Sequence, residues 1–111
     1  NFTKLRSTRL QISQLHENMK NTERQISMQA RSCQDNMKAC AEQVASNREA
    51  ILQAEKGREI AGKRYEVGKG TILEMNNSEV SLTQAKLTYS QSIYNYLAAK
   101  ADLEKIIGDA E

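Results

Sequence analysis

Apolar side chains recur every seven residues along the first half of the sequence. A seven-residue period that persists over many turns is typical of the seam of a coiled coil. Companion apolar residues follow the seam at plus three early in the chain and at plus four later, which predicts that the supercoil straightens locally. The seam residues are Leu5, Ile12, Met19, Ile26, Cys33, Cys40, Ala54 and Ala61, and Asn47 interrupts them.

One uninterrupted helix is expected from about residue 3 to residue 66. No glycine precedes Gly57 and the chain contains no proline, so nothing in this stretch breaks a helix. At ~1.5 Å per residue such a helix is roughly 95 Å long. A helix of this kind is not stable alone, so its stability has to come from partner helices.

The one clear break in the pattern is the segment YEVGKGT at residues 65–71. Gly68 can adopt the left-handed conformation that ends a helix. Thr71 followed by Glu74 forms the pattern of a capping box that opens the next helix. We therefore expect a tight helical hairpin with its tip turn at residues 67–71.

A second helix is expected from about residue 72 to residue 107, with Gly108 ending it. Two apolar stripes run along this helix, displaced by two positions, which is about 200° around a helix. Because both sides are apolar, both are expected to meet protein, as in a wall element packed between neighbours. One stripe is Leu73, Val80, Leu87, Tyr94 and Ala101, and the other is Leu82, Tyr89, Tyr96 and Leu103.

The predicted fold class is therefore all-α, with residues 1–111 forming a single long antiparallel coiled-coil hairpin. Folding the chain back at Lys69 leaves residues 1 to about 30 without a partner in this chain, so roughly 45 Å of helix overhangs. The same folding predicts three pairs of facing residues: Ile51 with Leu87, Val44 with Tyr94, and Met37 with Ala101.

Composition agrees with a thin, extended protein. The 111 residues are 39% hydrophobic, below the roughly 45 to 50% of a globular domain, so a thick core is hard to build. Sixteen basic and 14 acidic residues leave a net charge of +2 with no basic cluster, which argues against nucleic-acid binding. No run approaches the ~18 apolar residues of a membrane helix, and no signal-peptide pattern is present.

The cysteines and the single histidine do not predict reactive chemistry. Cys33 and Cys40 lie seven residues apart on one helix, about 10 Å between Cα atoms, beyond the ~7 Å limit for a disulfide. Both fall on the seam, where a cysteine acts as a small hydrophobe; a bond between subunits is the alternative. His16 has no ligand cluster at metal-binding spacing, and no phosphate loop or nucleophile elbow occurs. We expect no enzyme activity, no cofactor and no metal site.

The turn and the following helix carry an ordered string that is more specific than coiled-coil composition. It begins with RYEVGKGTILE at residues 64–74, continues as a ladder of Ala, Leu and Tyr, and closes with IIG at residues 106–108. In this string, over residues 61–108, the chain resembles the C-terminal repeat of TolC-like outer-membrane efflux proteins. The preceding helix matches mainly in its seven-residue period. The ladder positions include Leu82, Ala85, Leu87, Tyr94, Tyr96, Leu97, Ala101 and Leu103.

This resemblance implies one tunnel-wall hairpin of a longer channel subunit. Proteins of that family form trimers, with a β-barrel in the outer membrane of Gram-negative bacteria and a long α-helical barrel through the periplasm, to which each subunit supplies two hairpins. They serve tripartite efflux pumps and type I secretion systems. The expected partners are a periplasmic adaptor (membrane fusion) protein and further copies of the subunit in a trimer.

The resemblance also assigns roles at the tip. Two acidic residues one turn apart often ring the closed pore in that family; Glu74 occupies the first position here, and Asn77 replaces the second. Gly70 stands where a basic residue is common, so a latch based on that charge does not carry over. Glu74 serves either the pore ring or the capping box, and Tyr65 is either a tip latch or a packing aromatic. The residues expected to dock the adaptor are Tyr65, Val67, Gly68, Lys69, Gly70 and Thr71.

A second function from another class fits the same pattern. It is a free-standing coiled-coil interaction or spacer module, such as an adaptor hairpin. The tip string favours the channel, in which the tip would open by helix shifts without bond chemistry. The absence of amphipathic β-strand segments from these 111 residues is what the coiled-coil module predicts.

Overall fold

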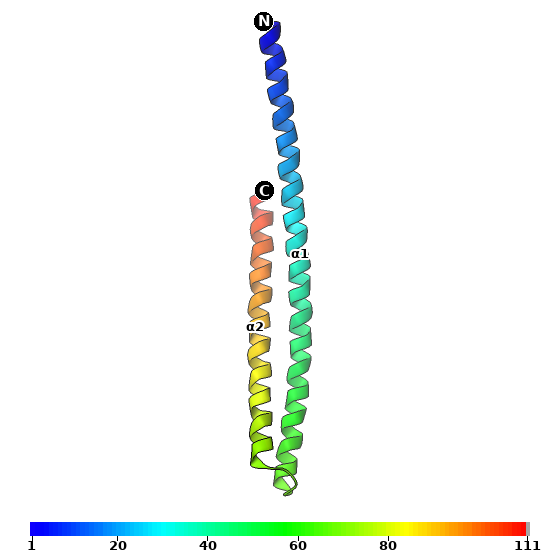
Figure 1. Cartoon of the computed structure of the whole chain (residues 1–111), viewed down its shortest axis with the longest axis vertical. Coiled ribbons are helices and arrows are strands. Elements are labelled where there is room, and N and C mark those ends of the chain that lie inside the picture. The colour runs from blue at the N-terminus through cyan, green and yellow to red at the C-terminus, as the bar shows by residue number, and fades with distance from the viewer. Residues whose placement is uncertain (111) are drawn as a thin grey trace.

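The computed structural model describes residues 1–110 as two helices joined by one turn. Helix α1 spans Phe2–Glu66 and helix α2 spans Ile72–Ala110. They run antiparallel in a rod of 100 × 18 × 13 Å (Figure 1). The expected all-α hairpin and its tip are confirmed. Asn1 caps α1, because its side-chain oxygen accepts a hydrogen bond from the Thr3 amide at 3.1 Å.

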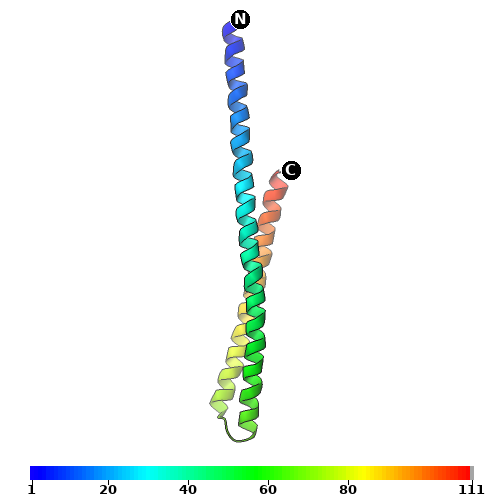
Figure 2. The same ribbon diagram turned by 90° about the vertical axis from the view of Figure 1, so that its right-hand side faces the viewer.

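The two helices cross at a shallow angle instead of lying strictly parallel. Figure 2 shows α2 passing from one side of α1 at the tip to the other side near its C-terminus. This wrapping is the geometry of a two-helix coiled coil. It keeps one face of each helix against the other along the whole paired length.

The paired face of α1 is the predicted seam with its plus-four companions. Its residues are half-buried, because only one neighbouring helix covers them. Along α2, the half-buried and buried residues also repeat at helical spacing. The α1 face is Ile26, Ala30, Cys33, Met37, Cys40, Val44, Asn47, Ile51, Ala54, Arg58 and Ala61; the α2 face is Met75, Ser78, Leu82, Ala85, Tyr89, Ser92, Tyr96, Ala99, Leu103 and Ile106. Cys33 and Cys40 are both free thiols.

A row of small residues brings the helices together. Ser78, Ala85, Ser92 and Ala99 stand seven residues apart on the inner face of α2, and Ser92 and Ala99 are each only 3% exposed. The Ser92 hydroxyl donates to the carbonyl of Tyr89 at 2.7 Å, which satisfies this buried polar group within its own helix. Small side chains allow the close approach of the backbones, and the larger residues beside them fill the remaining space.

The interruption at Asn47 is a polar contact between the helices. Asn47 is 8% exposed. Its side-chain nitrogen reaches the Thr88 carbonyl on α2 at 3.5 Å, and its side-chain oxygen accepts from Gln43 at 3.0 Å. The buried amide is therefore satisfied, as a polar group in a seam requires.

The predicted register is right, but the predicted face of α2 is wrong. The contacts from Asn47 to Thr88 and from Arg48 to Tyr89 agree with a fold-back at Lys69. However, Leu87 and Tyr94 are 61% and 68% exposed, and Ala101 is exposed as well. Polar residues flank that stripe, whereas small residues flank the stripe of Leu82 and Tyr89, so the latter stripe packs more closely on α1.

The two chain termini lie at different positions along the rod (Figure 1). Residues 1–25 of α1 are all exposed and extend beyond the end of α2, as Figure 1 shows, which confirms the predicted overhang. At the other chain end, the expectation that Gly108 ends α2 is wrong. The helix continues through Gly108 to Ala110, because glycine is tolerated inside a helix at a cost of only about 1 kcal/mol.

Candidate functional site

The C-terminus of α1 ends in a left-handed glycine, as predicted. Gly68 has a φ of 76°. Its amide donates to the Tyr65 carbonyl at 3.1 Å, and the Lys69 amide donates to the Arg64 carbonyl at 2.8 Å. This pair of bonds is a Schellman motif, which occupies carbonyls that the end of a helix would otherwise leave unpaired. The tip therefore has a defined backbone conformation.

Arg64 ties the two sides of the turn together. Its backbone carbonyl also accepts from the Gly70 amide at 2.9 Å. Its side-chain Nη2 donates to the Lys69 carbonyl at 3.1 Å, and its Nε lies 3.9 Å from the Glu74 carboxylate. One residue at the end of α1 thus contacts both the turn and the first turn of α2. The position of Arg64 in the motif RYEVGKGT did not by itself predict this role.

The predicted capping box forms only in part. The Thr71 hydroxyl accepts from the Glu74 amide at 3.1 Å, which is the N-cap bond. The Glu74 carboxylate pairs with Arg64, and within residues 1–110 no hydrogen bond from the Thr71 amide to this carboxylate is formed. Glu74 therefore lies beside Arg64 and does not act as the reciprocal capping acid.

The two glycines of the tip have different reasons to be small. A Cβ at Gly68 would meet nothing within 4 Å, so its positive φ alone favours glycine there. A Cβ at Gly70 would lie 3.0 Å from the Arg64 Cβ and 3.2 Å from the Tyr65 amide nitrogen. A side chain at Gly70 would therefore press on the end of α1, where the turn passes close to it.

The residues predicted to dock a partner are mostly exposed. Val67 is 68% exposed and Tyr65 is 44% exposed, while Lys69 and Thr71 are also exposed and Gly70 is half-buried. The chain brings these residues together at the end of the rod, farthest from both termini (Figure 1). Glu74 and Asn77 follow on the first turns of α2 and are exposed.

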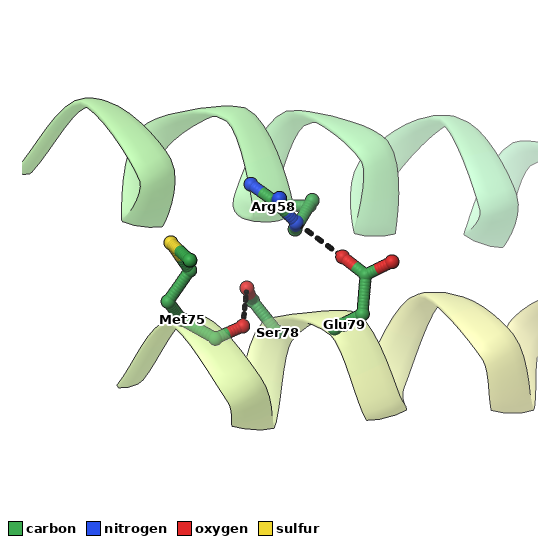
Figure 3. Close-up of polar contacts among 4 residues, drawn as sticks. All are labelled: Arg58, Met75, Ser78 and Glu79. Carbon is green, nitrogen blue, oxygen red and sulfur yellow. Dashed lines mark hydrogen bonds and ion pairs between the residues drawn. The ribbon is translucent and has the colours of Figure 1, made fainter. Parts of the chain in front are cut away.

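An ion pair just above the tip was not predicted. Arg58 on α1 pairs with Glu79 on α2, as Figure 3 shows, and Ser78 beside it donates to the Met75 carbonyl at 2.6 Å. A Cβ at Gly62 would lie 2.8 Å from the Arg58 guanidinium, so glycine leaves room for this side chain. The signal was available in the sequence, because Arg58 falls on the plus-four line of the seam and faces Glu79 in the predicted register.

A shallow groove lined mostly by polar residue types runs along one side of the hairpin near its middle. Hydrogen bonds link neighbouring side chains in it: Gln84 donates to the Thr88 hydroxyl at 3.4 Å, and Gln91 donates to the Asn95 side-chain oxygen at 3.1 Å. None of the lining side chains is charged. The lining residues are Gln43, Asn47, Gln84, Leu87, Thr88, Gln91, Ser92 and Asn95.

An apolar strip that shares Leu87 with this groove lies on the outer face of α2. Leu73, Val80, Leu87 and Tyr94 are each 61% exposed or more. They belong to the stripe that does not pack on α1. Within one chain these side chains have no covering helix, although they repeat at the same seven-residue spacing as the inner face.

Comparisons with known proteins found no matching protein family, no matching curated protein and no matching solved structure. The residues that the structure describes include no helix long and apolar enough to cross a membrane. In residues 1–110 there is also no group of three or more His, Cys, Asp or Glu side chains placed to hold a metal ion.

Proposed function

We propose that this hairpin is a periplasmic wall segment of an outer-membrane channel in a tripartite efflux pump or type I secretion system. The observation that carries the proposal is the second apolar face of α2. Leu73, Val80, Leu87 and Tyr94 stay exposed after α1 has covered the opposite face. A spacer hairpin needs only one apolar face, whereas a helix in a barrel wall needs two, because a neighbour packs on each side.

The tip supports docking of a periplasmic adaptor at residues 65–71. A surface that docks a partner gains affinity when it is already ordered, because less conformational entropy is lost on binding. The Schellman motif and the Arg64 contacts give this order. The apolar Val67 and the cationic Lys69 are exposed on it and are the side chains that an adaptor would contact.

Glu74 and Asn77 are the proposed pore-facing residues. Since Arg64 lies 3.9 Å from the Glu74 carboxylate, it offsets part of the negative charge that Glu74 would present to the pore. We therefore expect a weaker response to cations than a ring of two unpaired carboxylates would give. Replacing Arg64 by Gln should strengthen this response, and replacing Glu74 by Gln should abolish it.

A free-standing coiled-coil interaction module is the second candidate. The exposed seam of the overhang favours it, since Leu5, Ile12, Leu15 and Met19 are all 59% exposed or more. These residues continue the seam that α2 covers farther along α1. A partner helix, rather than a channel, could cover them.

Site-specific crosslinking in the native bacterium distinguishes the two candidates. A photoreactive residue at Lys69 should crosslink to an adaptor protein, and the hairpin should fractionate with the outer membrane. The same residue at Lys105, which is also exposed but far from the tip, is the matched control and should give no adaptor crosslink. Recovery outside the outer membrane with crosslinks at the overhang alone would support the coiled-coil module and contradict the channel.

A further inference from the structure

The packing face of α2 repeats itself every seven residues. Its small positions alternate between serine and alanine, and its large positions are leucine and tyrosine. Sliding α2 along α1 by one seven-residue step therefore replaces small residues by small ones and large residues by large ones. The small set is Ser78, Ala85, Ser92 and Ala99, and the large set is Leu82, Tyr89, Tyr96 and Leu103.

Apolar packing alone distinguishes poorly between these two registers. In coiled coils, polar and charged residues at or beside the seam commonly decide which register forms. Two such contacts survive a shift by seven residues, because Tyr96 would replace Tyr89 opposite Arg48 and Asn47 bonds only a backbone carbonyl of α2. The contact between charged side chains does not survive it. In the observed register Arg58 faces Glu79, whereas a shift by one step places Lys86 opposite Arg58.

We infer that the charges of Arg58, Glu79 and Lys86 hold the hairpin in the observed register and against a second register shifted by one seven-residue step. Arg58 attracts Glu79 in the first register and repels Lys86 in the second. Arg58 lies on the half-buried face of α1, from which its guanidinium reaches Glu79 on α2.

The shifted register changes the tip. When the pairing between the helices shifts by seven residues, each helix takes up about half of the shift. The turn therefore moves about four residues along the chain, and the end of the rod moves by about 5 Å. Val67 and Lys69 would then belong to α1, and the Schellman motif at Gly68 would be lost. The inner face of the hairpin thus determines which residues are presented at its end.

Two engineered cysteine pairs can report the register. A Cys33→Ser background leaves Cys40 as the single native thiol. Cys40 and Asn95 line one small cleft between the helices, so Asn95→Cys reports the observed register through a short thiol crosslinker. Asp102→Cys lies one seven-residue step later and reports the shifted register. The ratio of the two crosslinks measures the relative populations of the two registers.

The test is the charge exchange Glu79→Lys with Lys86→Glu. It puts like charges together in the observed register and opposite charges together in the shifted one. We expect the ratio of the 40–102 crosslink to the 40–95 crosslink to rise about tenfold, given the modest strength of partly exposed ion pairs. Adding Arg58→Glu reverses the remaining charge and should return the ratio to its starting value.

The matched control is Glu104→Lys with Lys105→Glu, which preserves net charge and lies far from Arg58. It should leave the ratio unchanged. A ratio that stays at its starting value in the Glu79 and Lys86 exchange would overturn the inference, because the turn or the apolar packing would then set the register. A rise that Arg58→Glu fails to reverse would overturn it equally.

Discussion

The covered and uncovered parts of α1 carry the same apolar seam. In residues 26–66 the seam lies against α2 and its members are half-buried, whereas in residues 1–25 every residue is exposed. Leu5 and Ile12 are placed like Cys33 and Cys40, at the same seven-residue spacing. The pattern therefore specifies that a helix needs a partner but does not specify which segment supplies it.

The paired part of the hairpin is held together without a thick core. Only Ala99 is a buried apolar residue in the described chain. Many half-covered side chains along a long interface replace a central cluster. Each of these side chains contributes little to stability, so the stability of the pairing depends strongly on the close approach that small residues on α2 permit.

The largest expected effect is at that close approach. Ala99→Leu should lower the free energy of unfolding by about 1–3 kcal/mol, because the added methyl groups force the helices apart. Ala101→Leu is the matched control, since Ala101 is exposed two residues away, and it should change stability by less than about 0.5 kcal/mol. Denaturant unfolding of both variants measures the difference, and equal effects would contradict the assigned face of α2.

Glycines should give effects of opposite sign in the turn and in the helices. Gly68→Ala should lower the free energy of unfolding by about 1–2 kcal/mol, because any residue with a Cβ resists the left-handed conformation. Gly57→Ala and Gly108→Ala should each stabilise by about 0.5–1 kcal/mol, because both glycines lie in helices with open space around them. Thermal unfolding of the three variants shows whether each substitution raises or lowers stability. A lower stability of Gly108→Ala would mean that α2 does end at Gly108.

The smallest expected effect is a local change in a titration. Lys63 lies 3.0 Å from Glu59 on the solvent side of α1, and its hydrogen bond and charge lower the pKa of Glu59. The stabilisation from this pair is present above the ordinary carboxyl pKa and is lost as the pH falls through the lowered pKa. Lys63→Gln should raise the Glu59 pKa towards its ordinary value in an NMR titration. An unchanged Glu59 pKa would show that the pair does not persist in solution.

Much of the fold could be predicted because the seven-residue apolar period and the turn glycine determine the structure of their own segments. The period of seven predicted α1, Gly68 predicted the turn, and the position of the turn predicted the register and the overhang. The face of α2 could not be chosen in the same way. Both stripes are apolar, and the choice depended on the small residues beside Leu82 and Tyr89, which matter only when two backbones meet.

The tip was predicted in outline and wrong in detail. Thr71 caps α2 as expected, but the Glu74 carboxylate contacts Arg64 instead of completing the capping box. That choice depends on how the turn places Arg64 across from Glu74, which spacing along the chain does not reveal. The pair of Arg58 and Glu79 was not predicted for a different reason, since an apolar seven-residue pattern does not by itself indicate that an arginine within it reaches the opposite helix.

Residue-resolved amide hydrogen exchange tests the central claim most directly, namely that pairing with α2 and not the seam itself makes α1 stable. In a dilute sample of the monomer, amides of residues 33–61 should be strongly protected, and amides of residues 1–25 should exchange as in a fraying helix. If the chain self-associates, protection of residues 1–25 should rise with concentration. Full protection of residues 1–25 in a verified monomer would contradict the account.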